Sequence, residues 1–217
     1  TSTMITSKDQ DQLFTVLAKT ITKDISCYAF GGTAMMFYGF KDETKDVDLL
    51  FEKEGERTEF IRALHQLGYQ EMSPGGIYLP EKLRNPHAPR MYRREDSRFD
   101  LFVGKIFKTL LSPKMKEDVY ALHEFKERQI LKIKVLRTEQ IVLLKAVTDR
   151  QNDFEDILTI VQKDTHFDWQ YLIDEVVWQY QHGDSWIILD TEKMLQELKR
   201  YLFIPEKYLQ QLYAVKK

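Results

Sequence analysis

Two aspartates one residue apart, Asp46 and Asp48, have the side chains and the spacing to do chemistry. They lie in the apolar stretch DVDLLFE, residues 46–52, which has the pattern of a strand. Aspartate is disfavoured in strands, and a carboxylate near a core is costly without a partner, so we expect positive groups beside both. Because side chains alternate along a strand, both carboxylates should face the same side. There they could hold one hard cation, or two cations roughly 4 Å apart.

Asp100 is the candidate for a third carboxylate. The stretch RFDLFV, residues 98–103, also embeds an acidic residue in an apolar strand pattern. If that strand pairs beside residues 46–52, the three carboxylates converge. All the candidate ligands are oxygen donors, so Mg²⁺ is the cation we expect. Salt bridges are the alternative for these carboxylates, and Arg98, on the same strand face as Asp100, is a rival partner.

A glycine pair, Gly31-Gly32, stands between an expected strand and a short expected helix. Without side chains, such a turn lets phosphate groups approach its backbone N–H groups, and the positive end of the following helix faces them. Thr33 could add a hydroxyl to the same site. An ordinary tight turn is the alternative interpretation.

The elements that must position these groups alternate between strands and helices. We expect strands at 26–30, 46–52 and 97–103 to share one mixed sheet, with a helix at 33–39 packed on it. Shorter strands are expected near 69–72, 76–80 and 90–94, and a strand pair near 127–136. The remaining helices are expected at 9–21, 57–69, 139–162, 167–181, 190–201 and 205–214.

Length and composition set the broad class. The chain has 217 residues, 43% of them hydrophobic, which supports a real core. We expect an α/β domain over residues 1–136 and a helical domain over 137–217. The formal net charge of −2 creates no global basic field, and the single Cys27 excludes an internal disulfide framework. The histidines show no ligand spacing, so a histidine metal site is not expected. Without a signal-peptide pattern or a membrane-length apolar run, we expect a cytoplasmic protein with no membrane partner.

The stretch from the glycine pair to the aspartates resembles the nucleotidyltransferase superfamily built like the palm of DNA polymerase β. The resemblance consists of Phe30-Gly31-Gly32, thirteen further residues, Asp46-Val47-Asp48-Leu49, and the later Asp100. It implies an α/β (α+β) palm with a mixed sheet, followed by a helical C-terminal domain, with the active cleft between them. It also implies that Asp46, Asp48 and Asp100 hold Mg²⁺ and that Gly31, Gly32 and Thr33 bind NTP phosphates. The implied reaction moves an NMP from an NTP, ATP among the candidates, to an acceptor hydroxyl or phosphate.

A second stretch, LRTEQIVLLKAVTDRQNDFEDILTIV at 136–161, resembles the helices after the palm in stand-alone nucleotidyltransferases of the abortive-infection and type IV toxin–antitoxin group. Lys145 matches a lysine of that group, and its polar cluster is matched by Asp149, Arg150, Asp153 and Asp156. The resemblance implies that Lys145 and Arg150 contact the nucleotide, and that an antitoxin protein is a possible partner. An unbroken helix would place 145, 149, 152 and 156 on one polar stripe. From the residues alone, Lys145 could equally be a solvated surface residue, and Arg150 could simply pair with Asp153.

Several functional alternatives stay open at this point. A basic segment at 82–98 could grip triphosphate or an RNA backbone, or it could be a solvated hairpin face; its cations are Lys82, Arg84, Arg90, Arg93, Arg94 and Arg98. The segment favours RNA, tRNA or a protein as the acceptor over an aminoglycoside-type small molecule. A catalytically silent member that binds nucleotide or RNA is the non-enzyme alternative. Residues 163–217 carry no motif.

Overall fold

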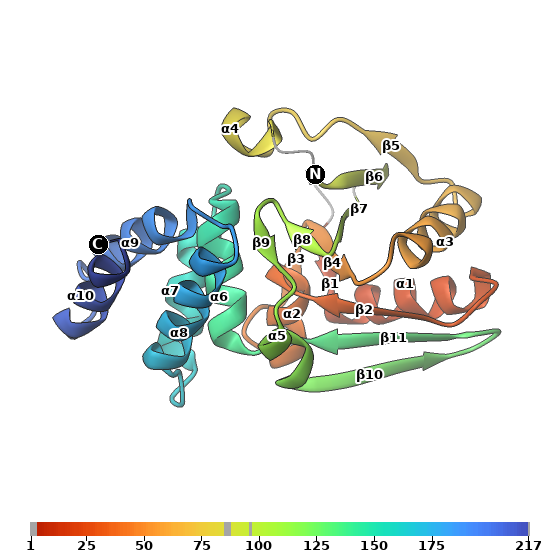
Figure 1. Cartoon of the computed structure of the whole chain (residues 1–217). Helices are drawn as coiled ribbons and strands as arrows, with labels where there is room; N and C mark the ends of the chain where they lie inside the picture. The colour runs from red at the N-terminus through yellow and green to blue at the C-terminus, as the bar shows by residue number, and fades with distance from the viewer. Residues whose placement is uncertain (1–3, 85–87, 96, 217) are drawn as a thin grey trace.

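A seven-stranded mixed sheet lies at the centre of the computed structural model, which describes residues 4–84, 88–95 and 97–216. The strand order is β10-β11-β2-β4-β7-β6-β5 (Figure 1). The strands are β2 (Ile25–Ala29), β4 (Asp46–Phe51), β5 (Gln70–Met72), β6 (Arg90–Arg94), β7 (Ser97–Val103), β10 (Ala121–Lys126) and β11 (Ile130–Val135). Two short ladders stand apart, pairing β1 (Ile5–Thr6) with β3 (Glu43–Thr44) and β8 (Lys105–Ile106) with β9 (Thr109–Leu110). The predicted α/β class with a mixed sheet is confirmed.

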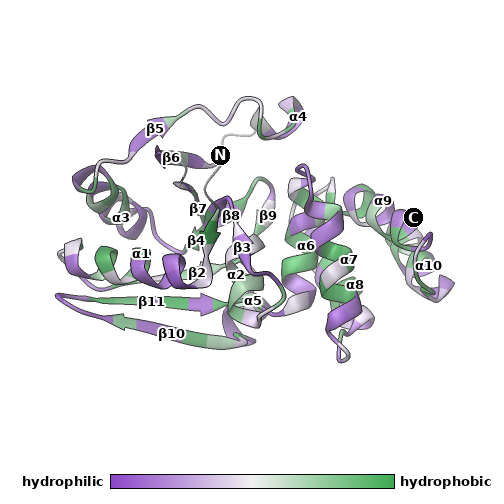
Figure 2. Ribbon diagram, turned by 180° about the vertical axis from the view of Figure 1, so that it is seen from behind, coloured by the Kyte–Doolittle hydropathy of each residue, from purple (hydrophilic) through white to green (hydrophobic). Residues whose placement is uncertain are grey.

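The middle of the sheet brings together the strands that carry the candidate chemistry. β4 runs antiparallel to β2 and parallel to β7, so the three expected strands are neighbours. The parallel register sets Asp48 opposite Asp100 and Asp46 opposite Arg98. Because β4 and β7 are covered on both faces, their remaining residues form nearly continuous apolar runs (Figure 2).

Helices pack against this sheet. The helices of this part of the chain are α1 (Ser7–Thr20), α2 (Gly31–Tyr38), α3 (Glu54–Gln66), α4 (Pro80–Leu83) and α5 (Pro113–Glu117). α1 and α3 contact each other as well as the sheet, and α2 packs on β4. Edge-to-face contacts of Phe60 with Phe51 and Phe99 fill the space beneath α3. The predicted packing of the short helix after β2 is confirmed.

The rest of the chain is helical and gathers beside one end of the sheet (Figure 1). Its helices are α6 (Thr138–Thr148), α7 (Asp153–Lys163), α8 (Trp169–Gln181), α9 (Ile187–Leu198) and α10 (Glu206–Val215). All residues of α6 are buried, because α6 lies among α2, α7, α8 and α9. The Gln179 amide joins α8 to β9 by two hydrogen bonds of 2.8 Å with the Leu110 backbone. The division of the chain into domains after residue 136 stays a prediction. None of the described helices is both long enough and apolar enough to cross a membrane.

The single helix expected over 139–162 is wrong, because the chain breaks it into α6 and α7. Asp149 and Asn152 adopt left-handed backbone angles, with φ of 44° and 72°. Aspartate and asparagine tolerate this region better than most residues. The Asp153 carboxylate accepts hydrogen bonds from the Thr148 hydroxyl and the Arg150 N–H, both at 2.7 Å. These local bonds compete with continued helix, so the expected polar stripe of 145, 149, 152 and 156 does not form.

The strand expected at 76–80 is also wrong. Only an isolated bridge pairs Gly75 with Tyr78, and α4 begins at Pro80. Proline suits the first turn of a helix, where its missing N–H costs nothing, and Gly76 turns the chain with φ of 87°. Tyr78 is thereby carried toward the aspartates instead of lying in a sheet.

Candidate active site

Three carboxylates converge at the centre of the sheet. Asp46, Asp48 and Asp100 each offer an oxygen, and these oxygens lie within 4.8 Å of one another. Asp48 and Asp100 are fully buried, and Asp46 is half-buried. The predicted convergence of the three side chains is therefore confirmed. An all-oxygen set at this separation can hold a metal ion and suits a hard cation such as Mg²⁺.

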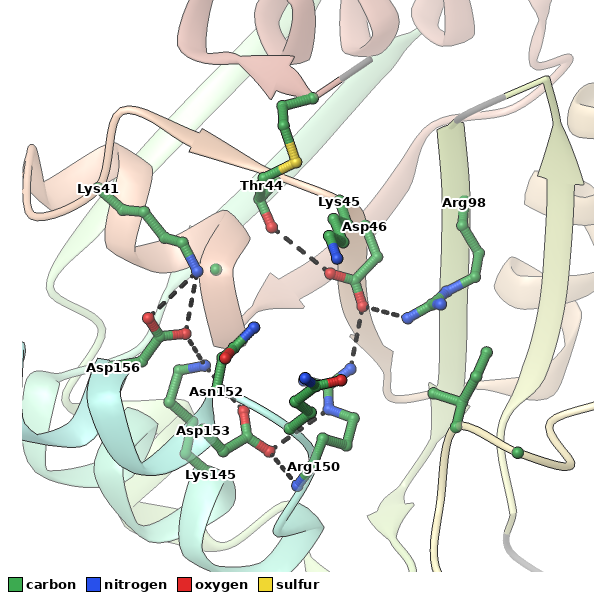
Figure 3. Close-up of a pocket in the computed structure, with 15 residues that line it drawn as sticks. Lys41, Thr44, Lys45, Asp46, Arg98, Lys145, Arg150, Asn152, Asp153 and Asp156 are labelled. Carbon is green, nitrogen blue, oxygen red and sulfur yellow. Dashed lines mark hydrogen bonds and ion pairs between the residues drawn. The ribbon is translucent and has the colours of Figure 1, made fainter. Parts of the chain in front are cut away.

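Two arginines already contact these carboxylates (Figure 3). Arg98 Nη2 lies 2.6 Å from Asp46 Oδ2, and Arg98 Nε lies 2.9 Å from Asp100 Oδ1. Arg150 Nη1 lies 3.0 Å from Asp46 Oδ2 and 3.3 Å from Asp100 Oδ2, while its Nη2 lies 3.3 Å from Asp48 Oδ2. The positive partners expected for the aspartates are therefore present. Arg98 forms the ion pair with Asp100 that the sequence offered as the alternative to a metal site, and it pairs with Asp46 as well.

Burial and these arginines give the three aspartates different pKa values. Burial opposes ionisation of Asp46, but Arg150 and Arg98 outweigh it and lower the pKa of Asp46. Burial raises the pKa of Asp48 to about 6 against the attraction of Arg150. Burial together with the charges of Asp46 and Asp48 raises the pKa of Asp100 to about 8. Without a further cation, the negative charge therefore lies mainly on Asp46 and Asp48.

The glycine pair makes room for the acidic strand. Gly31 has φ of 59°, and a Cβ there would lie 2.2 Å from Asp48 Oδ2. A Cβ at Gly32 would lie 2.5 Å from Thr44 Oγ1. Helix α2 begins at Gly31, so the pair forms its first turn instead of preceding it as expected. Only glycine lets the Asp48 side chain lie so close to this backbone.

Thr33 is buried and contacts the same strand. Its Oγ1 accepts a hydrogen bond of 2.9 Å from the Asp48 N–H. This contact fixes α2 relative to β4. A contact of Gly31, Gly32 or Thr33 with phosphate stays a prediction.

Lys145 is buried, and a solvated surface position for it is wrong. Its side chain is 3% exposed, and Nζ lies 3.1 Å from Asp153 Oδ1 and 2.8 Å from Asp156 Oδ2. Burial disfavours its charge, but Asp153 and Asp156 outweigh burial and raise the pKa of Lys145. Asp156 also binds Lys41 Nζ at 3.0 Å, so a chain of alternating charges leads away from the carboxylates.

One cavity of about 250 Å³ is lined by part of these groups, namely Gly32, Asp46, Arg98, Lys145, Arg150, Asp153 and Asp156. Asp48 and Asp100 are buried next to Asp46 and are not among its lining residues. Sequence reasoning missed Lys41 and Lys45 as lining residues, although both lie between the glycine pair and Asp46. It also missed Tyr78, whose hydroxyl donates a hydrogen bond of 3.0 Å to Asp100 Oδ2. No sequence signal marks Tyr78, because its segment has the pattern of a strand.

Three of the six cations of the basic segment 82–98 are paired with carboxylates. Lys82 binds Asp190 at 3.0 Å, Arg90 binds Glu71 at 3.1 Å, and Arg98 belongs to the aspartate cluster. Residues 85–87 and 96 of this segment lie outside the described residues. Arg93 and Arg94 donate to the backbone oxygens of Glu95 and Leu67 instead. The carboxylate partners therefore reduce, but do not remove, the support of this segment for binding a polyanion.

Comparison with known proteins adds weak structural similarity. No family model matches the sequence, and no curated protein matches it. One solved structure, described as a "putative nucleotidyltransferase from H. pylori", is 13% identical, with 95% of this chain and 90% of that chain covered. Its TM-score is 0.43. Similarity at this level establishes neither a shared fold nor a shared function.

Replacing Gly31 tests the close approach to Asp48. Gly31→Ala should lower the free energy of unfolding by about 2–5 kcal/mol, because left-handed strain and overpacking add. It should also weaken Mn²⁺ binding by moving the Asp48 carboxylate. Gly39→Ala is the matched control, since Gly39 has φ of 76° but nothing within 4 Å of an added Cβ. The control should lose about 1–2 kcal/mol through strain alone. Urea unfolding and Mn²⁺ titration give both quantities, and equal Mn²⁺ affinity in the two variants would contradict this account.

Lys145→Ala should destabilise the protein, because it leaves buried Asp153 short of a partner. Breaking a buried ion pair by removing one partner costs about 3–5 kcal/mol in free energy of unfolding. Lys193→Ala is the control, since Lys193 pairs with Asp149 at 2.7 Å while 63% exposed. An exposed pair contributes at most about 1 kcal/mol. Urea unfolding should separate the two variants, and similar losses would show that Lys145 is not held as described.

Proposed function

We propose that this chain is a metal-dependent nucleotidyltransferase, which moves an NMP from an NTP to an acceptor hydroxyl or phosphate. The observation that carries the proposal is the convergence of Asp46, Asp48 and Asp100 from two adjacent strands. The glycine turn that starts α2 lies directly beside them. The glycine turn and the three carboxylates, which the sequence resemblance implies for such an enzyme, thus lie side by side, and Gly32 and Asp46 line the cavity next to them.

Mg²⁺ is the proposed cation, since the three carboxylates form an all-oxygen site. Asp46 and Asp48 would each ligate both of two ions, and Asp100 would ligate one of them. When bound, such ions supply positive charge where the phosphates gather negative charge during transfer. The Gly31 backbone supports the fit of these residues to a cation. A side chain at Gly31 would fill the space that Asp48 Oδ2 occupies in the cluster.

The reaction joins the acceptor oxygen to the α-phosphorus and breaks the bond between that phosphorus and the leaving pyrophosphate oxygen. We assign Asp100 as the base that takes the acceptor proton, because it lies inside the cluster. Gly31, Gly32 and Thr33 are assigned to the β- and γ-phosphates. Lys145 and Arg150, which both line the cavity, are assigned to the charge of the departing pyrophosphate.

The acceptor class is RNA or tRNA, or a protein, with an aminoglycoside-type small molecule as the alternative. We also propose a toxin role with an antitoxin partner and a cytoplasmic location. These three parts of the proposal are supported by the sequence alone. Incubation with each α-labelled NTP, Mg²⁺ and total RNA, followed by separation of RNA from protein, identifies the acceptor. Label in neither fraction would count against both macromolecular acceptors.

A silent nucleotide-binding protein is the second candidate. It is favoured by Arg150, which contacts all three carboxylates and so satisfies them without a metal. A silent protein would bind NTP in equilibrium dialysis but transfer no label to any acceptor. Label transfer therefore decides between the two candidates.

Asp48→Asn should abolish Mg²⁺ binding and nucleotide transfer while the fold is kept, because it removes charge at nearly constant shape. Asp42→Asn is the matched control, since Asp42 is exposed in the connection between α2 and β3. The control should retain both properties. Calorimetric Mg²⁺ titration, label transfer and circular dichroism measure the outcome. Full transfer by Asp48→Asn would remove the metal assignment.

A further inference from the structure

The Arg150 guanidinium occupies the space that the three carboxylates share, and Figure 3 shows its contact with one of them, Asp46. It donates hydrogen bonds to all three, of 3.0 Å to Asp46 Oδ2, 3.3 Å to both Asp48 oxygens and 3.3 Å to Asp100 Oδ2. Its side chain is only 10% exposed. These oxygens are the donors that a divalent cation would need. A cation bound to all three carboxylates and the Arg150 guanidinium would need the same space between these oxygens.

Arg98 has a different relation to the cluster. It belongs to β7 itself, directly opposite Asp46 in the register, and contacts Asp46 and Asp100. No contact joins it to Asp48 among the described residues. Arg98 shares Asp46 Oδ2 and Asp100 Oδ2 with Arg150, but of these two arginines only Arg150 contacts Asp48 as well. The Arg150 guanidinium is therefore the group that a cation bound to all three carboxylates would replace.

We propose that Arg150 is an internal counter-cation that exchanges with the divalent cation, so that the cation enters by displacing the guanidinium. This inference rests on the cation site of the proposed function. It adds that the chain carries its own competitor for that site. Cation affinity is then set by the carboxylates and by the strength with which they hold Arg150.

Charge balance permits the exchange. Before a divalent cation binds, the negative charge lies mainly on Asp46 and Asp48, and Arg98 together with Arg150 balances it. Ligation of the cation needs all three carboxylates ionised, and beside Arg98 alone their formal charge is then −2. A divalent cation in place of Arg150 reduces it to zero. Because uncompensated buried charge is strongly unfavourable, the cluster holds Arg150 until a better partner arrives.

The local structure lets the guanidinium leave while the backbone stays. The Arg150 N–H is held by Asp153 Oδ2 at 2.7 Å, and Asp153 is fixed by Lys145 and Thr148. Arg150 lines both the cavity of about 250 Å³ and a neighbouring hollow of about 660 Å³, which share Gly76, Ile77 and Gln151. A rotation of the side chain alone therefore reaches open space. In the first cavity the released guanidinium joins Lys41 and Lys45, where it can meet phosphate by charge-assisted hydrogen bonds.

Mn²⁺ titration of the full chain, followed by electron paramagnetic resonance, tests the exchange. Arg150→Gln should bind Mn²⁺ at least tenfold more tightly than the wild type, which corresponds to about 1.4 kcal/mol. Lys45→Gln is the matched control, because it removes the same charge from an exposed side chain of the same cavity. With no described contact to the three carboxylates, Lys45 should change the affinity by less than about threefold, or 0.7 kcal/mol at RT ln 3.

Thermal melts with and without Mn²⁺ show whether each variant is folded. Arg150→Gln should melt lower than the wild type without Mn²⁺ and gain more from it, because tighter binding to the folded state stabilises more. If Arg150→Gln shows no folding transition, Mn²⁺ titration of Arg150→Lys tests the exchange instead. This variant keeps the charge, but its ammonium lacks the planar fork that reaches all three carboxylates, so Mn²⁺ should bind more tightly than to the wild type.

The outcomes test the cation site and the exchange with Arg150 separately. Suppose that the wild type binds Mn²⁺ and that Arg150→Gln, or Arg150→Lys if the first variant does not fold, binds it no more tightly than the wild type. That result overturns the exchange but leaves the cation site standing. Equal tightening by Lys45→Gln overturns the exchange as well, since general charge would explain it. No Mn²⁺ binding by the wild type or by either Arg150 variant overturns the cation site and the exchange together.

Discussion

Placing three carboxylates side by side in the middle of a sheet is the constraint on which this structure depends. The register of β4 with β7 brings Asp48 opposite Asp100, and both are fully buried. Their repulsion and burial must be balanced by positive charge. One balancing group, Arg98, comes from the sheet, and the other, Arg150, comes from the linker between α6 and α7. The helical part is therefore tied to the sheet by charge as well as by packing.

A second layer of ion pairs keeps that linker in place. Asp153 holds the Arg150 backbone and pairs with Lys145, which also binds Asp156. Asp156 in turn binds Lys41, in the connection between α2 and β3. Signs alternate along this path, so each buried charge has an opposite neighbour. The cavity next to the aspartates is thus lined by groups that fix one another, which is a requirement for a preorganised site.

The sheet and the aspartate cluster were predictable from sequence, whereas the contacts of the cluster were not. Apolar runs mark β4 and β7 as strands, and the alternation of side chains along a strand puts Asp46 and Asp48 on one face. The convergence with Asp100 also requires β4 to pair with β7, which local pattern does not give and which was expected only as a condition. The break after Thr148 was hidden, because the apolar residues at 147, 154, 158 and 161 keep helical spacing across it. It depends on the side chain of Asp153, whose competing hydrogen bonds leave no periodic signal. The burial of Lys145 and the position of Arg150 both follow from that break.

The central claim is that Asp46, Asp48 and Asp100 form a divalent-cation site, which Arg150 fills in the cation's absence. Crystals soaked in Mn²⁺ and measured at a wavelength with strong manganese anomalous scattering test it most directly. The account predicts an anomalous peak among the three carboxylates, with the Arg150 guanidinium turned away from them. At saturating Mn²⁺, a peak with Arg150 still in contact with all three carboxylates would contradict the exchange. The absence of any peak there would contradict the site itself.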